Sequence, residues 1–179
     1  MPDMEKLTTI EIEEKLARFF NYRQNIIVPN ISWGFYIHEC DLLILRRSGH
    51  LLEVEIKVTR ADLKKDQRKE HGHIDHNNRI KELWFAIPEY LQDSIDCIPE
   101  RAGILVLSRN NDMGPHLNCR IIKEARVNNQ AVKLCLDEKL AIARLGTLRI
   151  WSLKRKIIDM KNGRKRKRIN NKNQLKLFQ

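Results

Sequence analysis

The chain has 179 residues, 42% of them hydrophobic and 32% charged, which is ordinary for one soluble globular domain. Its apolar runs are too short to cross a membrane, and its first residues lack the basic and apolar regions of a signal peptide. We therefore expect a cytoplasmic protein without a membrane partner, whose four widely spaced cysteines are reduced.

Positive charge is concentrated at the carboxyl-terminal end. The net charge is +11, and residues 154–179 hold 11 Lys and Arg against a single acid, which leaves residues 1–153 nearly neutral. We expect residues 1–153 to form the folded domain and residues 154–179 a basic helix end and flexible arm. Such an arm adds salt-dependent affinity for nucleic acid, although it could also serve as a solubilising tail. Its densest part is the run Arg164, Lys165, Arg166, Lys167 and Arg168.

The first predicted element is a helix from Thr8 to about Asn21. Thr8 and Glu11 have the spacing of a capping box at its start. Glu13 falls beside the apolar stripe, where it could approach a functional site, although the helix dipole alone also favours acids near a helix start. The stripe itself consists of Ile12, Leu16, Phe19 and Phe20.

Extended segments follow. Residues 25–28 form a short piece that we expect to stop at Pro29, and residues 33–37 form a second piece. The apolar runs 42–45 and 51–58 flank a polar stretch with Gly49, which predicts a β-hairpin.

The second half of the chain continues with alternating helices and strands. The expected elements are a helix at 59–69, a strand at 83–87, a short helix at 89–95, a buried strand at 103–108, an edge strand at 118–126 and a final helix from 137. The order predicts an α/β (α+β) protein with an αβββαβ core, in which helices flank a mixed central sheet.

The hairpin brings ionisable groups together. If its turn is centred on Ser48, Asp41 faces Glu55, and Lys57 lies diagonally next to Asp41. Two carboxylates offer the hard oxygen ligands that Mg²⁺ prefers, and the ion lowers the pKa of a bound water and neutralises charge on a phosphodiester. The alternative is a structural ion pair on the surface of the hairpin.

Asp41 followed by Glu55-Ile56-Lys57, with a Glu-bearing first helix, resembles the PD-(D/E)XK nuclease superfamily. A closer likeness is to the MmcB-like DNA repair proteins. It covers roughly residues 8–110 and is carried by three stretches, Glu39-Cys40-Asp41, Glu55-Ile56-Lys57-Val58-Thr59-Arg60-Ala61-Asp62-Leu63-Lys64-Lys65-Asp66 and Leu83-Trp84-Phe85-Ala86-Ile87-Pro88. The chain departs from the superfamily pattern in having Cys40 in place of the proline before Asp41.

The resemblance implies a restriction-endonuclease-like fold and cleavage of DNA with Mg²⁺, for which Mn²⁺ can substitute, in DNA repair, recombination or phage DNA processing. Asp41 and Glu55 would be the metal ligands, Lys57 the catalytic lysine and Glu13 the first-helix acid. A non-catalytic DNA-binding module on the same scaffold is the alternative, and a nuclease for structured RNA is a third reading.

DNA is the expected partner, recognised by structure or by its ends, because backbone contacts do not read sequence. Lys64, Lys65, Arg68 and Lys69, on the helix that follows Lys57, would contact its backbone together with the arm. A nucleoid-associated location follows from this partner, and a homodimer is left open.

Other groups carry weaker signals. His71 and His73 lie in a predicted loop with His76 and Asp75, where they could touch phosphate, assist at the nuclease site or bind zinc. The three tryptophans, Trp33, Trp84 and Trp151, have apolar neighbours and are expected in the core rather than stacked on bases.

Overall fold

The computed structural model describes residues 6–31, 39–67, 78–109 and 117–175, and for residues 66–67 and 164–175 it describes the backbone alone. Three sequence predictions lie outside the described residues: the extended segment at 33–37, the end of the helix expected at 59–69 with Arg68 and Lys69, and the loop with His71 and His73.

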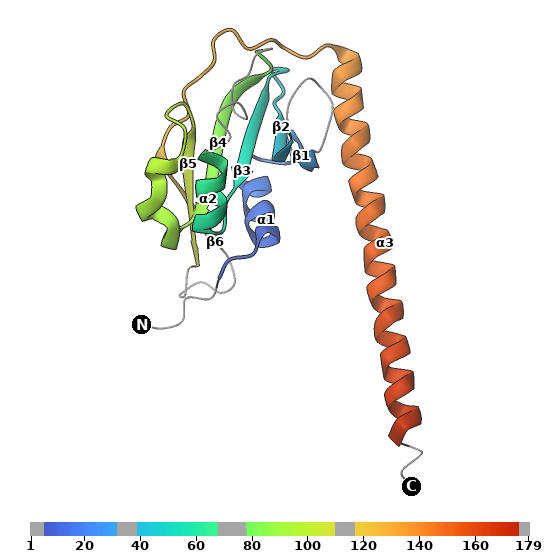
Figure 1. Cartoon of the computed structure of the whole chain (residues 1–179). Coiled ribbons are helices and arrows are strands. Elements are labelled where there is room, and N and C mark those ends of the chain that lie inside the picture. Colours follow the sequence, from blue (N-terminus) through green and yellow to red (C-terminus); the bar gives the residue numbers. More distant parts are fainter. Residues whose placement is uncertain (1–5, 32–38, 68–77, 110–116, 176–179) are drawn as a thin grey trace.

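Six strands form one mixed sheet whose spatial order follows the chain. The pairs β1/β2, β2/β3 and β5/β6 are antiparallel, whereas β3/β4 and β4/β5 are parallel (Figure 1). The strands are β1 (Ile26–Ile31), β2 (Cys40–Leu45), β3 (Leu51–Ile56), β4 (Ile80–Pro88), β5 (Gly103–Arg109) and β6 (Leu117–Lys123).

Three α-helices and one 3₁₀-helix accompany the sheet. They are α1 (Thr9–Phe19), α2 (Arg60–Gln67), the 3₁₀-helix η1 (Glu89–Cys97) and α3 (Leu136–Leu175). The first six elements therefore come in the expected order αβββαβ, and the mixed α/β architecture predicted from the sequence is confirmed.

Helix α1 covers one face of the sheet. Its capping box is formed, because Thr8 N donates to Glu11 Oε2 at 2.9 Å and Glu11 N donates to Thr8 Oγ1. Ile12, Leu16 and Phe20 are buried in a core with residues of β2 to β6. The predicted inclusion of Phe19 in the stripe is wrong, since its side chain is 37% exposed.

The other face of the sheet has two apolar clusters. Ile142 of α3 packs with residues of β1, β2 and β3, whereas Leu63 of α2 and Leu91 of η1 pack with residues of β4 and β5. Between these clusters, β3 presents Glu53 and Glu55, whose register partners on β4 are Leu83 and Phe85. Polar groups thus divide the apolar interior of this face along β3.

Strand β1 continues through Pro29, contrary to the expectation that it ends there. Pro29 pairs with Leu42 of β2. A proline is tolerated at this position because β1 is an edge strand, where the missing N–H need not bond to a neighbour. The strand then ends next to Asn30, which has a positive φ of 56°.

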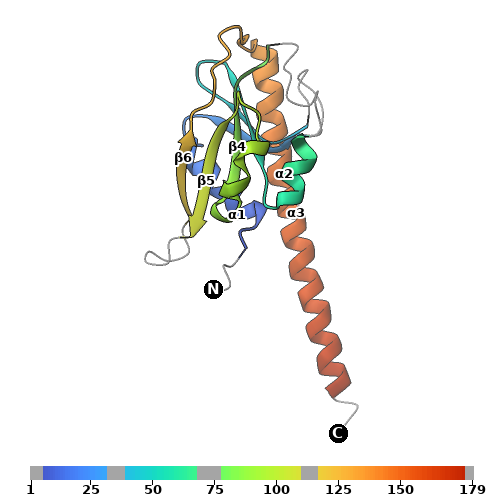
Figure 2. The same ribbon diagram turned by 60° about the vertical axis from the view of Figure 1, so that its left-hand side comes forward.

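Helix α3 begins against the sheet and runs well past its end, as both views show (Figures 1 and 2). Ile142 is fully buried, and the Arg149 guanidinium donates to the carbonyl oxygen of Asn30. Trp151 is 60% exposed, so the expectation that it belongs to the core is wrong. Trp84, in contrast, is buried as predicted. Residues 154–175, expected as a helix end and arm, are part of α3.

Among the described residues, no helix combines the length and the apolar character needed to cross a membrane.

Candidate active site

The hairpin of β2 and β3 has the register that the sequence predicted. Leu42 pairs with Val54, and Leu45 pairs with Leu51 next to the turn. Arg46 N donates to His50 O at 3.0 Å and closes the hairpin. The same register, continued one position beyond the Leu42/Val54 pair and away from the turn, places Asp41 opposite Glu55. The sequence expectation for this pair of acids is therefore confirmed.

Asp41 is anchored by the backbone of the neighbouring strand. Its Oδ2 accepts a hydrogen bond from Ile56 N at 2.8 Å. This bond uses one carboxylate oxygen and fixes the direction of the other. The side chain is half-buried at the open end of the hairpin, where β2 begins and β3 ends.

Glu55 and Lys57 form an ion pair with little exposure to solvent. Lys57 Nζ lies 2.6 Å from Glu55 Oε2, and the two side chains are 11% and 8% exposed. The Lys57 ammonium also stands over the Phe85 ring, 6.0 Å from its centroid. Burial raises the pKa of Glu55 to about 7; the Lys57 ammonium opposes this, and the negative charges of Asp41 and Glu53 add to it.

Glu13 approaches the same group from α1. Its Oε1 accepts a hydrogen bond from Asn30 Nδ2 at 3.3 Å. Burial raises the pKa of Glu13, and the negative charge of Asp41 raises it further, against the effect of the Asn30 bond. The structure thus brings Glu13, Asp41, Glu55 and Lys57 to one end of the hairpin, as the sequence predicted.

Glu53 received no role from the sequence, although it shares a strand face with Glu55 and Lys57. Its side chain is only 1% exposed. Its negative charge raises the pKa of Glu55 and contributes, after burial, to the raised pKa of the Cys40 thiol. The period-2 alternation of acids along β3 was the signal that could have identified it.

The carboxylates fit a divalent cation in part. Asp41 and Glu55 are hard oxygen donors, and their mutual repulsion would be relieved by a positive ion between them. Within the described parts of the chain, however, no three His, Cys, Asp or Glu side chains converge into a group that could hold a metal ion. Mg²⁺ commonly takes one or two carboxylates and completes its coordination with water and substrate phosphate.

Helix α2 starts close to this group along the chain. Thr59 caps it, since Asp62 N donates to Thr59 Oγ1 at 3.1 Å. The Tyr90 hydroxyl donates to Val58 O at 2.9 Å and ties the connection to η1. Lys64 and Lys65 are exposed on α2, so both ammonium groups are available to an anion.

Comparisons with known proteins add the fold alone. No protein-family model and no curated protein matches the chain. A solved structure of a protein of unknown function from Silicibacter pomeroyi is similar, with a TM-score of 0.55 and 14% sequence identity. The similarity covers 84% of this chain and 89% of the other.

Proposed function

We propose that this protein is a metal-dependent DNA endonuclease of the PD-(D/E)XK kind, with a restriction-endonuclease-like fold. The observation that supports it best is the group at the open end of the hairpin. There Asp41 is held by the Ile56 N–H at 2.8 Å and Glu55 by the Lys57 ammonium at 2.6 Å. Two fixed acids can hold a divalent cation, and an amine beside them can orient the attacking water, which suits metal-dependent phosphodiester hydrolysis.

In this proposal Asp41 and Glu55 hold Mg²⁺, or Mn²⁺ in its place. The bound ion would supply a more acidic water and neutralise negative charge on the phosphate. Hydrolysis forms one bond from a water oxygen to phosphorus and breaks one phosphorus–oxygen bond of the backbone. The attacking water gives up a proton to solvent, and the departing backbone oxygen takes up a proton from solvent.

The residues of the chain position these groups. Glu55 keeps the Lys57 ammonium at the site, where it can orient the attacking water or stabilise the charge that builds up on the phosphate oxygens. Glu13 tunes the site through its proximity to Asp41. Lys64 and Lys65 of α2 and the basic end of α3 contact the DNA backbone, which explains why we expect selection by DNA structure or ends.

The test is cleavage of supercoiled plasmid, linear duplex and four-way junction DNA with Mg²⁺ or Mn²⁺. The wild type should cut at least one of these substrates, and Lys57→Met should lower the rate by a factor of about 100 or more. Lys123→Met removes a lysine of β6 and is the matched control, which should cut like the wild type. Equal cleavage by the wild type and Lys57→Met would refute the assignment.

A second candidate is a DNA-binding module without catalysis. It is favoured by the finding that the described residues contain no convergent group of three or more metal-ligating side chains. This candidate requires salt-sensitive binding without metal-dependent cleavage, and loss of binding when residues 161–179 are removed. Binding and cleavage measured on the same substrates separate the two functions, and an RNA panel tests the third reading.

A further inference from the structure

Four basic side chains and one histidine gather at the opposite end of the hairpin from the candidate active site. We define the turn cluster as five residues that come from the β2–β3 turn, the start of β4, the segment before α3 and the first turns of α3. These residues are Arg47, His50, Lys81, Lys133 and Lys139. Figure 1 shows that the turn and the beginning of α3 lie at the same end of the molecule.

Backbone hydrogen bonds hold these separate segments together. Leu134 N donates to Gly49 O at 2.9 Å, and Asn128 N donates to Lys81 O at 2.8 Å. Gly49 has a φ of +89°, a backbone conformation that favours glycine, and the position of its missing Cβ lies 3.3 Å from Lys139 Nζ. The cations are therefore placed by the fold rather than by proximity in the sequence.

Among the described residues, no ion pair neutralises the charge of the cluster. In the described part of the chain, Arg47, Lys81, Lys133 and Lys139 take part in none of the ion pairs. Burial lowers the pKa of His50, and the positive charges of Lys81 and Lys133 lower it further, against a backbone hydrogen bond. Lys81 and Lys133 thus lie close to His50, and Lys139 lies close to Gly49, so their charges create a positive field at the turn.

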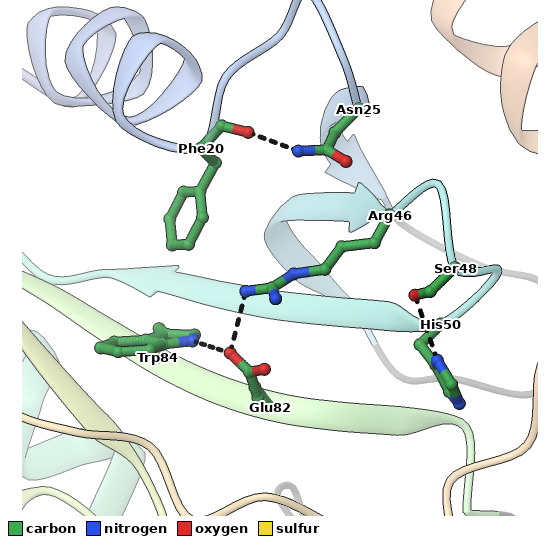
Figure 3. Close-up of polar contacts among 7 residues, drawn as sticks. All are labelled: Phe20, Asn25, Arg46, Ser48, His50, Glu82 and Trp84. Atoms are coloured by element: carbon green, nitrogen blue, oxygen red, sulfur yellow. Dashed lines mark hydrogen bonds and ion pairs between the residues drawn. The ribbon is translucent and has the colours of Figure 1, made fainter.

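Two of the three acids on these segments have partners among the described residues. Glu82 Oε2 accepts from Arg46 Nη2 at 3.2 Å and from Trp84 Nε1 at 3.1 Å, as Figure 3 shows. Glu138 binds Arg79 at 2.8 Å and also accepts from Cys135 N. Asp137 is exposed beside Glu138 and is the one acid of this end for which the described contacts include no ion pair.

We propose that the turn cluster is a second contact for the phosphate backbone of DNA. Uncompensated Lys and Arg side chains are the groups that neutralise phosphates, and these four come from segments that the fold brings together. The proposal rests on the DNA-directed function above and adds a surface remote from the hydrolytic group.

The length of β3 gives the distance between the turn cluster and the candidate active site. Lys57 follows His50 by seven positions, and at about 3.3 Å per residue of strand this is about 23 Å. A duplex rises about 3.4 Å per base pair, so about seven base pairs would link the turn cluster to the candidate active site. Because β3 itself is buried, DNA that reaches both would lie on the surface roughly parallel to this strand, in the direction in which α3 runs (Figure 1).

The experiment measures binding without cleavage. Fluorescence anisotropy with a labelled 24-base-pair duplex in EDTA gives the dissociation constant at several NaCl concentrations. The triple variant Lys81→Gln/Lys133→Gln/Lys139→Gln should bind at least tenfold more weakly at low salt. Because each lost phosphate contact lowers the salt slope by about 0.9, the slope should fall by up to about 3.

The control removes the same charge elsewhere. Lys15→Gln/Lys123→Gln/Arg126→Gln lowers the net charge equally on α1, on β6 and after β6, and should bind nearly like the wild type. Circular dichroism establishes that both triple variants are folded. Equal weakening of both variants, or no weakening of the turn-cluster variant, would overturn the proposal.

This outcome is separable from that of the proposed function. If the wild type binds DNA through the turn cluster but never cleaves it with Mg²⁺ or Mn²⁺, the nuclease assignment fails and the contact stands. If the wild type cleaves and the turn-cluster variant binds with unchanged affinity and salt slope, the contact fails and the nuclease assignment stands.

Discussion

The buried carboxylate of Glu55 should make the stability of the protein fall as the pH rises. Its pKa is raised to about 7 in the folded protein from an ordinary value of 4.5, first of all by burial. Between these two pH values the folded state keeps a proton that the unfolded chain releases. The contribution is therefore fully present below pH 4.5 and is lost as the pH rises through 7.

The magnitude follows from the size of the change. Each pKa unit corresponds to about 1.4 kcal/mol, so Glu55 lowers the free energy of unfolding by up to about 3 kcal/mol between pH 4.5 and 8. Glu55→Gln has no proton to release and should lack this decline. Loss of the contact with Lys57 changes the free energy of unfolding of Glu55→Gln at every pH. The comparison is therefore between the slopes of free energy against pH, not between the free energies themselves.

The assay is urea unfolding followed by circular dichroism from pH 4.5 to 8.5, in buffer with EDTA. Glu124→Gln, which changes an exposed acid, is the control and should keep the wild-type slope. Added Mn²⁺ should stabilise the wild type at pH 8 more than Glu55→Gln, because a cation favours the charged carboxylate. The same pH slope for the wild type and Glu55→Gln would refute the reasoning.

Three further predictions concern other parts of the fold. Gly103→Ala should lower stability by about 1–3 kcal/mol in thermal unfolding, because its Cβ would lie 2.7 Å from a backbone nitrogen and against an indole ring. Gly146→Ala is the control; its Cβ would meet a methyl group at 3.4 Å, and it should be neutral or stabilising. If the Gly103→Ala and Gly146→Ala variants had the same melting temperature, the packing argument would be contradicted. Glu11→Gln should cost about 1 kcal/mol at pH 7, since hydrogen bonds from the capping threonine lower the pKa of Glu11 to about 2. That difference should close as the pH falls from 4.5 to about 2, and a gap independent of pH would exclude this cause. Cys135 is exposed and should react rapidly with a thiol reagent, whereas Cys40 is buried with a raised pKa and should react only after unfolding.

Local patterns in the sequence determined the parts of the fold that depend on neighbours along the chain. The capping box of α1 and the hairpin register that places Asp41 opposite Glu55 both depend on residues less than twenty positions apart. The register of a hairpin is determined by its turn and by the alternation of apolar and polar residues along its strands. Both can be recognised in a short stretch of sequence. The acid pair and Lys57 could therefore be identified before the structure was available.

Only the tertiary structure decided which side chains lose contact with water. It buried Glu53 between two apolar clusters, left Trp151 of α3 exposed, and carried β1 through Pro29 at the edge of the sheet. It also joined Lys81 and Lys139, 58 positions apart in the sequence, around one turn. The burial of a side chain and the charges around it depend on contacts between segments that are distant in the chain. Composition and periodicity do not predict which of these segments will be in contact.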